Sequence, residues 1–176
     1  DGSDSCTLIA DANGNVTLPD SVSDGWYDDT NHICYKNGET VAYTRDTHNA
    51  NYLNTQEGKN LPVVHCVKGS DGWQVYGETA KALAEVEAPA IDKLVFGMDI
   101  SDPAVAAVLP EHADEIELVG LVSNICVVSN AVALQSKYPE ATIFVDASCT
   151  DSFDKSLHEK VLDVLEGFQV KVVNRA

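Results

Sequence analysis

From about residue 40 onward, the chain alternates between short β-rich runs and stretches with apolar residues at helical spacing. Such alternation is typical of a parallel sheet covered by helices on both faces. The sequence therefore predicts an α/β fold, a three-layer α/β/α sandwich with a central, mostly parallel, Rossmann-like sheet. A length of 176 residues suits a single domain, 1–176. The expected strands are 41–44, 93–96, 115–122, 141–146 and 169–173, and the expected helices are 77–87, 102–109, 126–137 and 154–166.

The first forty residues are less regular. Residues 6–11 form an apolar run that ends in Asp11 and suits a strand. The dipeptides 13–14 and 37–38 are both Asn-Gly, which favours hairpin turns. A helix over about residues 24–35 would instead suit an α/β unit. The sequence leaves both interpretations open.

The charge of the chain excludes two classes of partner. It has 28 acidic and 11 basic residues, a formal net charge of −17. Nucleic acids and anionic membranes favour basic surfaces, so we expect neither as a partner. The longest apolar runs are too short to span a bilayer, and no secretory leader precedes Cys6. Nothing here argues for secretion, and the odd number of widely spaced cysteines suits reduced thiols in a cytoplasmic protein.

The cysteines indicate free thiols, one of them in a special place. Five cysteines, an odd number with no CxxC pair, argue against a disulfide framework or a structural zinc site. Cys126 is expected in the first turn of a helix, where backbone N–H groups and the helix dipole stabilise a thiolate and an oxyanion. The alternative for Cys126 is a buried structural thiol, which is also the interpretation for Cys6, Cys34, Cys66 and Cys149.

A group of acidic and histidine residues follows the expected strand 41–44. Asp46 and His48 come directly after it, and Glu57 and His65 come soon afterwards. Reactive groups gather at the carboxyl ends of parallel strands, so we expect this group near the segment that contains Cys126. Carboxylate and imidazole ligands suit Zn²⁺, Fe²⁺ or Mn²⁺ at an open site. The alternative is a set of scattered surface polar residues.

Lys93 and the remaining histidines have less specific settings. Lys93 directly precedes an apolar run, and a lysine that flanks a strand is usually solvated. A partly buried lysine near a thiol would instead favour the thiolate and the oxyanion. His32, His112 and His158 have no such neighbours and are expected to be exposed.

These segments, in this order, resemble the isochorismatase-like cysteine hydrolases, and among them most the nicotinamidases. The resemblance runs from Val41 to near the C-terminus. Residues 44–48, Thr-Arg-Asp-Thr-His, resemble the metal-ligand segment of the family, and residues 57–69 resemble its continuation. Residues 93–97 resemble the strand that carries the catalytic lysine, and residues 120–126 resemble the nucleophile loop.

The resemblance implies one divalent metal, with Zn²⁺ as the first choice and Fe²⁺ or Mn²⁺ as alternatives. The metal would orient a pyridine nitrogen or a water molecule. The ligands implied by the resemblance are Asp46, His48, Glu57 and His65.

The resemblance also implies the catalytic roles. Cys126 would attack an amide carbon, release ammonia and leave a thioester that water hydrolyses, with Lys93 beside it. The oxyanion would be bound near a cis peptide that the family has in this loop, matched here to the bond between Val122 and Ser123.

The N-terminus departs from the family pattern, in which the first strand ends in an aspartate that acts as the general base. Only residues 8–11 are comparable here; the family's glutamine is missing, and Val16 replaces an aromatic residue. We expect Asp11 to be the base, because removing a central strand would expose two neighbouring edges. The alternative alignment places residues 1–3 after that strand and leaves out both the strand and its aspartate.

The function that the resemblance implies is hydrolysis of a small planar amide, with nicotinamide as the leading substrate. One alternative is a carbamoyl or ureido compound, and another is a catalytically degenerate member that acts as a binding protein. Enzymes of the family that cleave a vinyl ether do not use a cysteine nucleophile, so Cys126 disfavours that reaction. Members commonly form dimers or tetramers, which implies a homo-oligomer.

Overall fold

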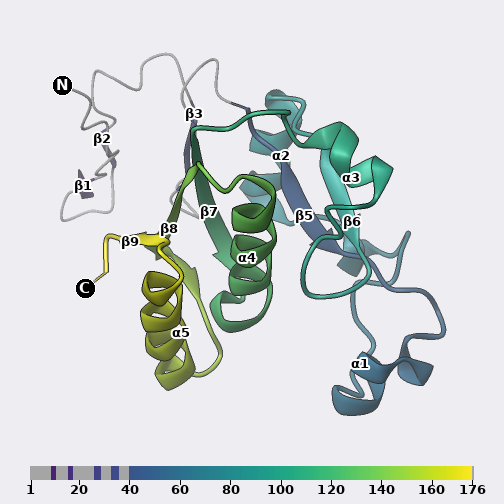
Figure 1. Cartoon of the computed structure of the whole chain (residues 1–176). Helices are drawn as coiled ribbons and strands as arrows, with labels where there is room; N and C mark the ends of the chain where they lie inside the picture. The colour runs from purple at the N-terminus through teal and green to yellow at the C-terminus, as the bar shows by residue number, and fades with distance from the viewer. Residues whose placement is uncertain (1–8, 11–15, 18–25, 29–32, 36–39, 176) are drawn as a thin grey trace.

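The computed structural model describes residues 9–10, 16–17, 26–28, 33–35 and 40–175. Between residues 40 and 175, strands and helices alternate along the chain (Figure 1), which confirms the predicted α/β class. The strands of this part are β5 (Tyr43–Asp46), β6 (Ala90–Lys93), β7 (Glu115–Leu121), β8 (Thr142–Asp151) and β9 (Lys171–Val173). The helices are α1 (Gln56–Asn60), α2 (Gly77–Glu85), α3 (Pro103–Val108), α4 (Val128–Lys137) and α5 (Lys155–Gly167). Single turns are η2 (Tyr52–Asn54), η3 (Asp71–Trp73) and the π-helical η4 (Ser123–Val127).

The strands of this part pair in parallel, in two groups. β5 pairs with β6, and β7, β8 and β9 pair in that order. Among the described strands, none pairs with the second edge of β5 or of β7. Asp46 and Lys93 lie opposite each other at the carboxyl ends of β5 and β6. Side chains that end these strands therefore meet at one edge, where α/β proteins place their binding sites.

One hydrophobic core joins the two groups of strands. Leu162 and Leu165 of α5 and Val145 of β8 have an exposed fraction of 0%. Ile91 of β6 and Val105 of α3 belong to the same cluster. Helices α4 and α5 contact each other and lie over β7, β8 and β9 (Figure 1). The apolar stripe of α5 faces inward because its leucine and valine residues recur at helical spacing.

The described part of the N-terminus contains two antiparallel pairs. β1 (Ile9–Ala10) pairs with β2 (Val16–Thr17), and β3 (Trp26–Asp28) pairs with β4 (Ile33–Tyr35). The hairpin interpretation therefore holds, and the helix over residues 24–35 is wrong. The expectation that residues 6–11 form a central strand of the parallel sheet is also wrong for the residues described. Ile9 and Ala10 pair with β2 and not with the parallel strands. Asp11 lies outside the described residues.

The strand predicted at residues 93–96 lies a few residues earlier. β6 ends at Lys93 and begins at Ala90, with Ile91 and Lys93 buried on the same side of the strand. Leu94, Val95 and Phe96 follow the strand and are exposed, so apolar composition alone misplaced it. Lys93 therefore lies at the carboxyl end of a strand, the end where reactive groups gather.

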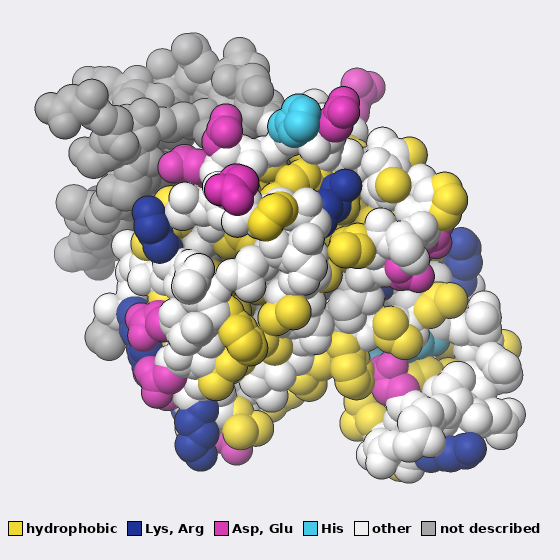
Figure 2. All heavy atoms as spheres, viewed as in Figure 1, with side chains coloured by type: hydrophobic (Ala, Val, Ile, Leu, Met, Phe, Trp, Pro, Cys, Tyr) yellow, Lys and Arg dark blue, Asp and Glu magenta, His cyan; other side chains and the backbone are white. Residues whose placement is uncertain are grey.

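The surface is mixed in chemical character. Figure 2 shows acidic side chains scattered among hydrophobic and uncharged ones on one face. A hollow separates the segment around α1 from the rest of this face, and histidine and acidic side chains are visible on its wall. None of the helices in the described ranges is both long enough and apolar enough to cross a membrane.

We expect the N-cap of α5 to contribute measurably to stability. The Asp154 side chain accepts hydrogen bonds from the backbone N–H groups of Ser156 and Leu157. Replacing it, Asp154→Ala, should lower the free energy of unfolding by about 1 kcal/mol, because two N–H groups lose their acceptor. Urea denaturation followed by circular dichroism measures this change. The control Asp154→Asn retains an acceptor and should lose much less; equal losses in both variants would contradict the capping role.

Candidate active site

The carboxyl ends of the strands bring a lysine, a carboxylate and a thiol together. Lys93 Nζ lies 3.5 Å from Cys126 Sγ and forms an ion pair with the carboxylate of Asp46. The Lys93 residue is 5% exposed, so its charge is held almost entirely out of solvent. A buried ammonium needs an opposite charge close by, and Asp46 provides it across the β5–β6 register. The arrangement places a cationic group beside the Cys126 thiol, which is the kind of setting in which reactive cysteines occur.

The turn that carries Cys126 begins at the end of β7. Gly120 has φ of +109°, which only glycine adopts readily, and the β7–β8 register shifts at this point. Val122 is extended, and the π-helical turn η4 then leads from Ser123 directly into α4. Cys126 therefore lies at the start of a helical segment, where backbone N–H groups are available to an oxyanion.

The predicted position of the cis peptide is wrong by one residue. The non-proline cis bond lies between Leu121 and Val122, not between Val122 and Ser123. A non-proline cis bond has no signature in the residue types that flank it, because the high cost of the cis form applies to any such pair. Val122 and Ser123 nevertheless both lie in the turn before Cys126, as expected from the loop.

Polar side chains fasten this turn to the surrounding elements. Asn130, one helical turn after the thiol, donates from Nδ2 to the carbonyl of Cys126 at 2.9 Å. Its Oδ1 accepts from the backbone N–H of Met98 at 2.8 Å, which ties the turn to the loop after β6. The hydroxyl of Ser152, in the link between β8 and α5, donates to Asn124 Oδ1 at 2.6 Å. The position of the thiol is therefore set from several sides.

Three of the four predicted metal ligands lie together. One potential ligand atom from each of His48, Glu57 and His65 falls within 4.8 Å of the others. Glu57 Oε1 lies 3.6 Å from His48 Nε2 and 4.0 Å from His65 Nε2. The chemistry of this set, two imidazoles and a carboxylate, is that of an open zinc site.

The state of His48 fits a metal ligand. Its Nε2 is buried and has no hydrogen-bond partner among the residues that the structure describes. Burial lowers the pKa of His48, although the Glu57 carboxylate opposes the effect and His65 adds to it. The imidazole is therefore neutral at physiological pH, the form in which histidine binds a metal. A cation would satisfy the unpartnered nitrogen and the adjacent carboxylate together.

Aromatic and backbone contacts hold the metal ligands in place. The ring of Tyr52, only 1% exposed, packs against His48 and His65 with centroids 4.5 and 5.0 Å away. The His48 N–H donates to the Cys66 carbonyl, and the Lys68 N–H donates to the His48 carbonyl, both at 2.9 Å. The two histidine-bearing segments therefore run side by side.

The segment before His48 is fixed by Trp73. The indole N–H of Trp73 donates to the buried hydroxyl of Thr47 at 2.8 Å, and the Arg45 guanidinium lies 3.6 Å above the ring. Thr47 stands between Asp46, which faces Lys93, and His48, which faces Glu57. The structure thus places the fourth predicted ligand, Asp46, against the lysine and outside the group of three.

The structure also involves residues that the sequence analysis did not select. Asn130 could have been found, since it lies four residues after Cys126 on an expected helix. Tyr52 and Trp73 have no local signal that links them to the histidines. The prediction that His158 is exposed is wrong. The residue is only 8% exposed, and its Nδ1 lies 3.0 Å from the hydroxyl of Ser123. Its burial follows from its place on the inner face of α5, beside the core leucines.

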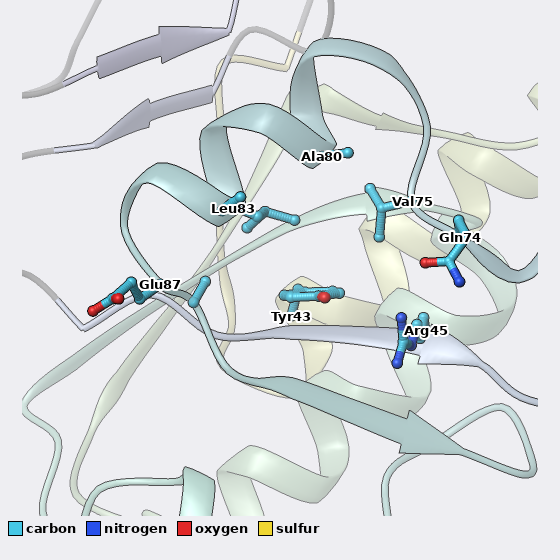
Figure 3. A pocket seen from close by; sticks show the side chains of 9 residues that line it. Tyr43, Arg45, Gln74, Val75, Ala80, Leu83 and Glu87 are labelled. Carbon is cyan, nitrogen blue, oxygen red and sulfur yellow. The ribbon is translucent and has the colours of Figure 1, made fainter.

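A cavity between β5 and α2 is separate from this chemistry. It has a volume of about 320 Å³, and Tyr43 and Arg45 point into it from β5 (Figure 3). Alternate residues of a strand point to opposite faces, so Asp46 is directed away from the cavity. None of the predicted catalytic or metal-binding residues that the structure describes lines it.

Comparison with known proteins gives a family and a set of structural neighbours. A family model described as the isochorismatase domain matches residues 29–176. The solved nicotinamidase/pyrazinamidase of Bacillus subtilis is 21% identical, with a TM-score of 0.67 over 77% of this chain and 75% of that chain. The yeast nicotinamidase Pnc1p is 17% identical, with a TM-score of 0.63 over 78% and 80% of the two chains.

A third neighbour contains a metal. The pyrazinamidase of Pyrococcus horikoshii, solved in complex with zinc, is 16% identical, with a TM-score of 0.60 over 78% of this chain and 76% of that chain. At these identities the likeness to solved structures shows a shared fold. Comparison with curated protein sequences gives no match.

We expect the purified protein to bind one zinc ion through the histidine–glutamate group. Glu57→Gln should weaken zinc binding about 10–100-fold, because it removes a charged ligand between the two imidazoles. Competition against a chromophoric chelator measures the affinity. The control Glu85→Gln changes an exposed glutamate of α2 and should leave the affinity unchanged. Equal affinity in wild type and Glu57→Gln would contradict the assignment.

We also expect Lys93 to control the reactivity of Cys126. Lys93→Met should slow alkylation of Cys126 by iodoacetamide about tenfold at pH 7, since the nearby ammonium no longer favours the thiolate. Peptide mass spectrometry separates this thiol from Cys66 and Cys149, the pKa values of which are raised by burial. Lys160→Met, on the exposed side of α5, is the matched control. An unchanged rate in folded Lys93→Met would show that the lysine has no such effect.

Proposed function

The chain belongs to the isochorismatase family of hydrolases, and we propose that it is a metal-assisted cysteine amidohydrolase with nicotinamide as its substrate. The observation that carries this proposal is the contact of Lys93 Nζ with Cys126 Sγ at 3.5 Å, near the histidine–glutamate group. The pKa of Cys66 is raised by burial and, to a smaller extent, by the nearby Cys126 and Glu57, which supports a shared region for the thiol and the metal ligands. A nucleophilic thiol close to a metal site suits the hydrolysis of a small amide, which both groups could contact at once.

In this mechanism Cys126 attacks the carbonyl carbon of the amide. The C–S bond forms as the carbonyl electrons move to oxygen, and N–H groups of the turn at residues 122–126 stabilise the oxyanion. Collapse of the intermediate breaks the C–N bond and releases ammonia after protonation of the nitrogen. Water then hydrolyses the thioester, which yields the carboxylic acid and restores the thiol.

Lys93 and two aspartates would manage charge and protons in these steps. Lys93 stabilises the thiolate before attack and favours negative charge on the intermediate. Asp11 remains the proposed general base, because a carboxylate is needed to take the proton of the thiol. Asp46 remains a proposed metal ligand, and a carboxylate can serve both Lys93 and a metal because it has two oxygens.

A divalent metal, with zinc as the first choice, would be held by Asp46, His48, Glu57 and His65. When bound, it would supply a Lewis-acid centre for a pyridine nitrogen or a water molecule. The presence of zinc in the pyrazinamidase neighbour supports this choice, as does the unpartnered Nε2 of His48.

The names of the structural neighbours support nicotinamide over other amides, although they share only 16–21% of their residues with this chain. A carbamoyl or ureido compound is the second candidate, because attack by the same thiol would release ammonia from such a compound as well.

We propose further that the protein is a cytoplasmic homo-oligomer, a dimer or tetramer. Of the cysteines whose side chains are described, Cys66 and Cys126 are free thiols, which agrees with a reducing environment.

The expected result is release of ammonia from nicotinamide by the purified, zinc-loaded protein. Cys126→Ala should lower the turnover at least about a thousandfold, because the nucleophile is lost. Chelation should abolish turnover, and zinc should restore it. The matched control Cys149→Ala changes a thiol on β8 and should retain activity.

The other outcomes separate the alternatives. Turnover that survives in Cys126→Ala would contradict the thioester mechanism. Ammonia release from a carbamoyl compound but not from nicotinamide would select the second substrate class. A protein that binds zinc and has a reactive Cys126 yet hydrolyses none of these compounds would be a degenerate member of the family.

A further inference from the structure

A buried hydrogen bond connects helix α5 to the turn that carries the thiol. The Ser123 hydroxyl and His158 Nδ1 share a hydrogen bond of 3.0 Å. Ser123 is 0% exposed, and His158 is 8% exposed. Ser123 is the first residue of η4, and Cys126 is the fourth. The contact therefore acts on the same short turn as the nucleophile.

The histidine is held on a rigid support. The His158 N–H donates to the Asp154 carbonyl at 2.9 Å in the capped first turn of α5. The same helix is anchored in the core by Leu162 and Leu165, both fully buried. A ring fixed by a well-packed helix can impose a position on its partner, whereas a surface side chain cannot.

The turn transmits the position of Ser123 to the thiol over a few bonds. The N–H groups of Ile125 and Val127 both donate to the Val122 carbonyl, at 3.1 and 3.2 Å. A shift of Ser123 would therefore move Cys126 relative to Lys93. The contact of Asn130 with this turn is only partly buried, whereas the Ser123–His158 contact is shielded from water. Loss of the histidine would leave a buried hydroxyl without its partner, which favours rearrangement of the turn.

We propose that His158 is a positioning residue for the nucleophile, and that it acts through Ser123 to hold Cys126 Sγ against Lys93. The inference rests on the proposed function only in taking Cys126 as the nucleophile. His158 itself does not contact the thiol in this arrangement; its effect is geometric. A small displacement of a reacting group is enough to lower a rate strongly.

The test measures the rate at which iodoacetamide alkylates Cys126 in the full chain, by peptide mass spectrometry. His158→Ala and Ser123→Ala should each slow alkylation about tenfold, the factor that corresponds to one hydrogen bond. The double variant should be no slower than either single one, because both remove the same contact. His158→Asn places an amide atom near the position of Nδ1 and should restore most of the rate.

A matched control separates positioning from stability. Val161→Ala shortens a core side chain one turn further along α5 and should lower stability with little effect on the alkylation rate. Equal slowing in Val161→Ala, additive effects in the double variant, or an unchanged rate in folded Ser123→Ala would each overturn the proposal. If His158→Ala fails to fold, Ser123→Ala and His158→Asn still decide the question.

Turnover provides a second readout. If nicotinamide is the substrate, His158→Ala should lower kcat about tenfold and leave KM unchanged, because the histidine does not contact the substrate. A rise in KM with kcat unchanged would contradict positioning. If the wild type hydrolyses no amide, the proposed function fails, while the alkylation rates still test the role of His158.

Discussion

The burial of one positive charge organises the site. An ammonium out of solvent is costly unless an opposite charge is close, and Lys93 meets this condition through Asp46 on the neighbouring strand. The ion pair fixes the side chains of Asp46 and Lys93 at the carboxyl ends of β5 and β6. Cys126, which arrives from the end of β7, completes the group. The two sets of parallel strands thus share a chemical centre as well as a hydrophobic core.

The metal group depends on a second, largely aromatic framework. The buried ring of Tyr52 packs against both His48 and His65, while Trp73 holds the adjacent Thr47. Gly58, in the short helix that carries Glu57, has no room for a side chain, because a Cβ there would meet the backbone of Tyr52. The carboxylate can approach the imidazoles only because this helix packs so closely. Small and aromatic residues around the metal group therefore determine whether three ligands can share one cation.

The sequence predicted the fold well wherever hydrophobic periodicity was strong. The alternation after residue 40 and the helices that contain Ala131 and Leu162 follow from local pattern. The strand around Lys93 was misplaced because Leu94, Val95 and Phe96 have strand-like composition, yet they lie beyond the strand and are exposed. Only tertiary packing distinguishes a buried apolar run from an exposed one. For the same reason, nothing local indicated that Asp46 turns toward the lysine. The inward face of His158, by contrast, follows from its helical spacing to Val161 and Leu162.

The setting of Trp73 has a practical consequence. Its indole bonds to Thr47, which lies between the lysine's carboxylate partner and the first metal-binding histidine, and the Arg45 guanidinium lies over the ring. A rearrangement of the segment from Asp46 to His48 would therefore alter both a hydrogen bond and a charge on one fluorophore. The chain thus contains an intrinsic optical probe beside its active centre, so that emission from this ring can report the occupancy and order of the site without any added label.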